Sequence, residues 1–125
     1  MMYSYTYLEK EISKSYRDRL NESKKPSEVQ EIFSKSILTL LSKITEELGN
    51  YEVNDLKLIP LDKQKYEMSE KMKKDPRVAY LMKESDLPAI IERMAKDAAN
   101  RYLKLVNDDD RTGTFKLSPK RTKQV

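Results

Sequence analysis

The chain has 125 residues, enough for one domain with a buried core, and 37% of them are charged. Cysteine and histidine are both absent, which excludes thiolate nucleophiles, imidazole acid–base catalysis and metal sites built from sulfur or imidazole ligands. Only two glycines are present, which disfavours glycine-rich phosphate loops and many-turned β-sandwiches, so the composition favours an all-α fold.

The N-terminal stretch combines two patterns. Residues 3–7 alternate tyrosine with small polar residues, which is typical of a short strand. Such aromatic rings can stack on nucleic-acid bases, or they can pack over one end of a helical bundle. Apolar residues then recur at steps of four and predict a helix over residues 7–20. Thr6 and Glu9 have the spacing of a capping box, in which two side chains satisfy backbone N–H groups of the first turn.

Residues 26–49 carry the clearest helical pattern in the chain. Their apolar side chains recur at steps of three and four and line one face of a helix with about 3.6 residues per turn. Ser27 and Gln30 have capping-box spacing, and Gly49 can adopt the left-handed conformation that closes a helix. We therefore predict a core helix that begins and ends at these signals.

The apolar band of this helix is broader than one neighbouring helix needs. Leu38 lies off the main stripe and, with Leu41, widens the band near the middle of the helix. We therefore predict that these two leucines contact a second subunit, which makes a homodimer or a partner protein the expected assembly.

The segment that follows residue 49 is apolar but lacks a helical period, so we predict a buried, partly extended crossover. Pro60 is incompatible with the interior of a helix and disfavours helical geometry in the residue before it. A third helix is predicted to begin just after it, with Asp62 as its cap, and to end near Lys74. Its lysines are interspersed with acidic residues, which is typical of a solvated face.

Two more helix starts follow, each with a polar cap and a proline in the first turn. Asp75 and Pro76 open a short helix, and the same signal opens a final helix over residues 85–107. The apolar stripe of this last helix is as wide as that of residues 26–49, so the two are predicted to pack together. The chain is therefore predicted to form an all-α, antiparallel bundle of about four main helices over residues 1–107.

The positive charge of the chain is concentrated at its C-terminus. The formal net charge is +4, and from Arg111 onwards there are five basic residues and no acidic one. Residues 108–125 are predicted to be a flexible, disordered tail, within which residues 112–117 alternatively form an edge strand. A flexible basic segment can neutralise phosphates without defined geometry, although it can also serve only to keep a protein in solution. The predicted contact residues are Arg111, Phe115, Lys116, Lys120, Arg121 and Lys123.

Carboxylates are the remaining side chains for catalysis, and any metal site would need oxygen ligands. Glu47 is followed at the third position by Asn50. This stretch is similar to part of the ExxE motif of the all-α nucleoside triphosphate pyrophosphohydrolases, which bind magnesium through ExxE and a following ExxD. Asparagine replaces the second glutamate and no ExxD follows, so the resemblance is limited to half of one motif. A magnesium-dependent nucleotide hydrolase is therefore the third hypothesis.

The first hypothesis is a non-enzymatic, nucleic-acid-associated or accessory protein that uses the basic C-terminal end. The second is a homo-oligomeric protein–protein interaction module. No cofactor or metal ion is predicted. No apolar run approaches the roughly 20 residues that span a bilayer, and the N-terminus lacks a signal-peptide pattern, so we expect a cytoplasmic protein without a membrane partner.

Overall fold

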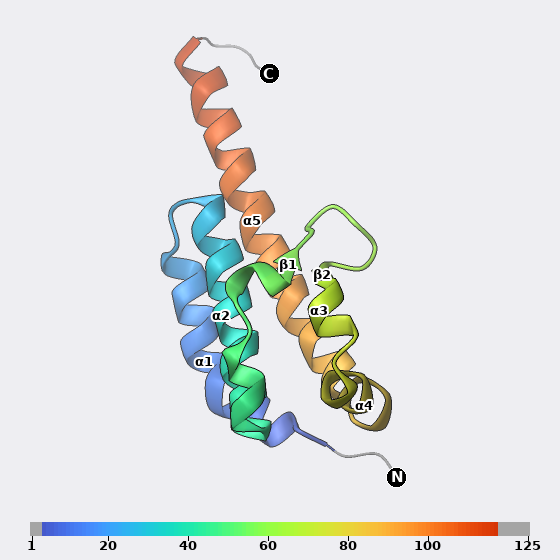
Figure 1. The fold of residues 1–125 in the computed structure, drawn as a ribbon. Helices are drawn as coiled ribbons and strands as arrows, with labels where there is room; N and C mark the ends of the chain where they lie inside the picture. Colours follow the sequence, from blue (N-terminus) through green and yellow to red (C-terminus); the bar gives the residue numbers. More distant parts are fainter. Residues whose placement is uncertain (1–3, 118–125) are drawn as a thin grey trace.

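The computed structural model describes residues 4–117 of the chain. Within this range, three long helices form a bundle: α1 (Thr6–Glu22), α2 (Pro26–Ile44) and α5 (Leu87–Leu117). Helix α2 runs antiparallel to α1 and α5 and packs against both of them (Figure 1). The predicted all-α helical bundle is confirmed, as is the predicted contact between the two helices with the widest apolar stripes.

A smaller group of elements lies beside this bundle (Figure 1). Two strands pair in antiparallel fashion, with Leu56 opposite Met68 and Leu58 opposite Tyr66. All four of these side chains are buried, because alternate residues of both strands face the core. The elements of this group are η1 (Glu46–Asn50), η2 (Val53–Asp55), β1 (Leu56–Leu58), β2 (Tyr66–Met68), α3 (Glu70–Lys73) and α4 (Pro76–Glu84).

The core is formed mainly where α2 meets α5. Each helix turns an apolar stripe inward, and Ala95 and Ala98 of α5 are fully buried, so their small side chains allow close approach of a neighbouring helix. Tyr16 joins α1 to the same core: its ring is buried and its hydroxyl donates to the carbonyl of Met94 at 2.6 Å. The fully buried residues of α2 and α5 include Val29, Phe33, Ile37, Leu40, Leu41, Leu87, Ile90 and Ile91.

Polar side chains of α2 satisfy the edge of β1 that faces away from β2. The Gln30 Oε1 accepts a hydrogen bond from the Leu58 N–H at 2.8 Å, and the Gln30 Nε2 donates to the Leu56 carbonyl at 3.3 Å. The Ser34 hydroxyl donates to the same carbonyl. A buried backbone donor or acceptor without a partner is costly. Helix α2 therefore takes the place of a third strand.

Helix α1 begins where its apolar pattern predicted, but without the predicted capping box. Residues 6 and 7 are helical, so a strand over residues 3–7 was a wrong expectation for its described part, and Tyr3 lies outside the described residues. Glu9 forms an ion pair with Arg93 of α5, 2.7 Å between oxygen and nitrogen, instead of closing a capping box with Thr6. Glu9 therefore binds a residue of another helix rather than the N-terminus of its own helix.

Helix α2 starts at the predicted residue, but its ends are made differently. The carboxylate of Glu28 accepts hydrogen bonds from the N–H groups of Lys24 and Lys25, so the capping box predicted for Ser27 and Gln30 was wrong. The helix ends at Ile44 rather than Gly49, and the chain continues as the 3-10 helix η1.

The helix predicted to follow Pro60 was wrong. The chain forms the β1–β2 hairpin there, and Pro60 lies in its turn. Regular helix resumes only at α3, whose cap is Ser69: its hydroxyl accepts from the Met72 N–H at 3.2 Å. Strands of three residues gain their stability from cross-strand pairing, and this pairing leaves little local signal.

The last two helices begin as predicted, but α5 is longer. Asp75 caps α4 by accepting from the Arg77 N–H at 2.9 Å, and the Ser85 hydroxyl accepts from the Leu87 N–H at 3.1 Å. Helix α5 continues to Leu117, so an edge strand over residues 112–117 was wrong, whereas the flexible tail predicted for residues 108–125 stays a prediction. Across residues 4–117, none of the helices combines the length and apolar character needed to cross a bilayer.

Candidate functional site

The predicted phosphate contacts fall into two groups. Arg111, Phe115 and Lys116 lie in the last turns of α5, which continues past the turn between α1 and α2 (Figure 1). The remaining three, Lys120, Arg121 and Lys123, lie outside the described residues.

The predicted subunit contact contains one residue that has no exposed surface. Leu41 is fully buried in the core of its own chain, so the expectation that it contacts a second subunit was wrong. Leu38 is half-buried and packs against the same core. Helix α2 is contacted by η1 as well as by α1 and α5, and Leu48 of η1 is fully buried.

A groove with charged side chains in its lining lies where η1 meets the junction between α3 and α4. It is open to solvent and has a volume of about 820 Å³. Segments far apart in the sequence meet here, because after the hairpin the chain returns through α3 and α4 (Figure 1). Eight residues line the groove: Glu47, Asn50, Tyr51, Lys71, Lys74, Asp75, Pro76 and Arg77.

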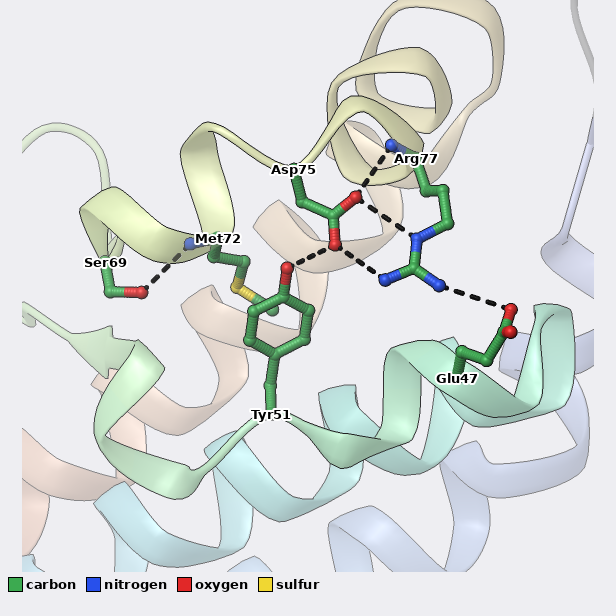
Figure 2. A network of polar contacts seen from close by, with 6 residues as sticks. All are labelled: Glu47, Tyr51, Ser69, Met72, Asp75 and Arg77. Carbon is green, nitrogen blue, oxygen red and sulfur yellow. Dashed lines mark hydrogen bonds and ion pairs between the residues drawn. The ribbon is translucent and has the colours of Figure 1, made fainter.

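Asp75 is the centre of a hydrogen-bond network in this groove (Figure 2). Its Oδ1 accepts from the backbone N–H of Arg77 at 2.9 Å and from the Arg77 Nε at 3.2 Å. Its Oδ2 accepts from the Arg77 Nη2 at 3.0 Å and from the hydroxyl of Tyr51. The other terminal nitrogen of Arg77, Nη1, donates to the Oε1 of Glu47 in η1 at 3.2 Å. The network therefore ties the start of α4 to η1 and the residue that follows it.

These contacts shift the pKa values of Asp75 and Tyr51 away from neutral pH. Hydrogen bonds from Arg77 and then from Tyr51 keep the pKa of Asp75 well below its usual range. Partial burial, together with the hydrogen bond to Asp75, raises the pKa of Tyr51 to about 12. Asp75 is therefore charged and Tyr51 neutral near pH 7.

Two lysines complete the groove. The Lys71 ammonium lies over the ring of Tyr51, 5.4 Å from its centroid, in a cation–π contact. Lys74 is exposed at the C-terminal end of α3. In the described part of the chain, neither ammonium forms an ion pair with a carboxylate. The lining as a whole carries three cations and two carboxylates, a net charge of +1. Lys71 also interacts electrostatically with Asp55, which lies outside the lining.

The carboxylate compared with the pyrophosphohydrolase motif is engaged elsewhere. Glu47 points toward Arg77 in Figure 2, and Asn50 lines the same groove. Among the described residues, no three acidic side chains come close enough together to hold a metal ion. The structure thus provides no described carboxylate cluster on which a magnesium site would be built.

Sequence reasoning found one residue of this groove by its role and missed the others. The cap role of Asp75 was readable from the Asp-Pro pair. Its hydrogen bond to Tyr51 joins residues 24 positions apart, and the ion pair between Arg77 and Glu47 joins residues 30 apart. Such contacts depend on how the hairpin folds back, which no local spacing indicates.

Comparison of the chain with family models, with curated proteins and with solved structures finds no match. Two features of the molecule itself are candidates for function. These are the basic C-terminal part of α5 and the groove between η1 and α4.

Proposed function

We propose that the protein binds nucleic acid, without catalysing a reaction, through the basic C-terminal end of the chain. The observation that carries this proposal is the path of α5, whose range includes Arg111 and Lys116 and which continues past the turn between α1 and α2 (Figure 1). A helix end that leaves the bundle can approach a phosphate backbone without interference from the rest of the fold. The basic residues nearest the C-terminus extend the same charged segment.

Binding of this kind is electrostatic and independent of sequence. Each lysine or arginine that neutralises a phosphate releases condensed counterions, so the affinity falls as the salt concentration rises. If all five basic residues from Arg111 onwards contact a duplex, log K falls against log salt concentration with a slope of about −4.5. Acidic residues 108–110 precede this segment and set its N-terminal limit.

The experiment measures DNA and RNA binding by fluorescence anisotropy over a series of salt concentrations. In the test variant, Arg111, Lys116, Lys120, Arg121 and Lys123 are replaced by Gln. We expect weaker binding and a flatter slope than in the wild type. In the control variant, five exposed basic residues on other elements are replaced by Gln, which lowers the net charge equally: Lys10, Arg17, Lys63, Lys73 and Lys83.

The control separates the position of the charge from its total. If placement matters, the control variant binds nearly as well as the wild type while the C-terminal variant does not. Equal losses in the two variants would show that only net charge counts. Unchanged binding in the C-terminal variant, or no binding by the wild type at low salt, would refute the proposal.

Self-association is the second candidate, favoured by two apolar residues on the same helix. Leu103 and Val106 are half-buried, and neither is among the side chains packed against the core cluster. Spaced three residues apart, they lie on one side of α5, where a second copy would cover them. Sedimentation velocity should then show a dimer at micromolar concentration that Leu103→Glu converts to a monomer. A monomeric wild type would refute this candidate.

A further inference from the structure

The groove between η1 and α4 carries a net positive charge. Its lining contains three cations and two carboxylates, a net charge of +1. Both carboxylates contact Arg77, and among the described residues neither lysine forms an ion pair with a carboxylate, although Lys71 interacts electrostatically with Asp55, which lies outside the lining. A concave surface with a net positive charge and two exposed ammonium groups points to an anionic ligand.

We propose that this groove binds a phosphorylated small molecule through its phosphate groups. Lys71 and Lys74 would contact the phosphate oxygens, since lysine ammonium groups are mobile point charges that suit phosphate. The third contact would come from the Arg77 Nη1, which donates to Glu47 in this structure. The groove volume of about 820 Å³ is that of a small-molecule site.

The groove recognises phosphate rather than a nucleotide base. Tyr51 is its single aromatic ring, and the Lys71 ammonium already lies over that ring. The hydroxyl of Tyr51 is also committed, because it donates to Asp75. Stacking of a base on the face occupied by Lys71 would displace this cation from the place where it serves a phosphate.

Glu47 lies at Arg77, at the position where a phosphate oxygen would bind. Its side chain is 71% exposed and meets Arg77 through one nitrogen at 3.2 Å. Asp75 is different: its side chain is 10% exposed and it engages the guanidinium on two nitrogens. An incoming phosphate would therefore displace Glu47 and leave the pair of Asp75 with Arg77 intact. The Glu47 carboxylate acts as a competitor of the ligand.

If Glu47 competes with the ligand, neutralising its side chain should increase the affinity of the groove for phosphate. Replacing Glu47 with Gln removes one negative charge from the groove and preserves the size of the side chain. The expected result is tighter phosphate binding, by about threefold to tenfold at low salt. A substitution that damages the fold ordinarily weakens binding, so a gain in affinity is difficult to explain by general damage to the fold.

The experiment is isothermal titration calorimetry of the full chain with pyrophosphate at low salt. The wild type should bind, Glu47→Gln should bind more tightly, and the double variant Lys71→Gln/Lys74→Gln should lose about tenfold or more in affinity. The control is Lys73→Gln/Lys83→Gln, which removes two exposed lysines that do not line this groove and should retain most of the affinity.

Several results would overturn the proposal. They are no pyrophosphate binding by the wild type at millimolar concentration, no gain in Glu47→Gln, or equal losses in the test and control lysine variants. A dephosphorylated oligonucleotide provides another arm. If its affinity falls in Lys71→Gln/Lys74→Gln but not in the control, the groove belongs to the nucleic-acid surface and the small-molecule assignment is wrong.

The site is independent of the proposed function of the C-terminal end. The variant in which the five C-terminal basic residues are replaced by Gln should bind pyrophosphate as the wild type does, because none of its substitutions lies in the groove lining. Loss of pyrophosphate binding in this variant would place the phosphate contacts at the C-terminus and overturn the groove assignment. Failure of nucleic-acid binding alone would leave the groove proposal unaffected.

Discussion

Gln30→Ala tests whether α2 acts as the missing neighbour of β1. In the wild type, the Gln30 side chain accepts from the Leu58 N–H at 2.8 Å and donates to the Leu56 carbonyl at 3.3 Å. Truncation leaves the Leu58 N–H without this partner at a residue that is 7% exposed. An unsatisfied buried donor costs about 1–3 kcal/mol, and we therefore expect a loss of about 2 kcal/mol in the free energy of unfolding.

Helix propensity acts in the opposite direction and makes the test conservative. Alanine is the better helix former, so the substitution alone would stabilise α2 by a few tenths of a kcal/mol. Ser34→Ala should cost less, about 1 kcal/mol, because the Leu56 carbonyl keeps its contact with Gln30. The two losses should not add, since both side chains share that carbonyl.

Urea denaturation followed by circular dichroism measures these losses at an unchanged m-value. Ser27→Ala is the matched control: it lies on the same helix, is exposed, and should change the unfolding free energy by less than about 0.5 kcal/mol. The reasoning is refuted if Gln30→Ala costs no more than this control. A large loss in Ser27→Ala would instead restore the capping role that the structure denies it.

Two further predictions concern the core and the polar network. Ile91→Ala removes a fully buried side chain from the contact of α5 with the core and should cost about 2–5 kcal/mol; a loss under about 0.5 kcal/mol would remove Ile91 from the core. For Tyr51→Phe, the pH dependence is the readout. The pKa of Tyr51 is raised from 10.0 to about 12, so the folded state binds the phenolic proton more tightly than the unfolded state. Its stabilising contribution is therefore present below pH 10 and is lost as the pH rises to about 12. The difference in unfolding free energy between the wild type and Tyr51→Phe should narrow over this range, and a constant difference would contradict the assignment.

The long helices were predictable because their apolar residues repeat with the period of the helix itself. The stripe of α2 needs no knowledge of its partner to be recognised, and the same holds for α5. The starts of α4 and α5 were also readable, since Pro76 and Pro88 restrict the backbone locally beside a polar cap. These features are encoded within a few residues, and the structure confirms them.

The hairpin and the ends of several elements were not predictable in this way. Strands β1 and β2 are three residues each, and their alternation is too short to distinguish from an irregular crossover. Leu41 was assigned to a subunit contact because nothing local showed that η1 would contact α2. The polar residues 108–110 suggested the end of α5, yet the helix continues through them.

The two capping boxes that failed have a common physical cause. Glu9 and Gln30 each had the correct spacing to reach back to a helix N-terminus, where the gain is about 1 kcal/mol at an exposed site. In the fold, Glu9 pairs with Arg93 and Gln30 with β1, and both new partners lie far away in the sequence.

The difference between these failures and the starts that succeeded lies in the cost of the alternatives. Local capping loses only a hydrogen bond that water can replace, whereas the buried Leu58 N–H needs an acceptor, which Gln30 provides. Proline does not take part in this competition, because its ring fixes the backbone whatever the neighbouring side chain binds. A polar pair is therefore a weaker signal than a proline, and α2 shows both: it begins at Pro26 as predicted, while Gln30 does not cap it. The Gln30 amide instead bonds the Leu58 N–H and the Leu56 carbonyl of β1.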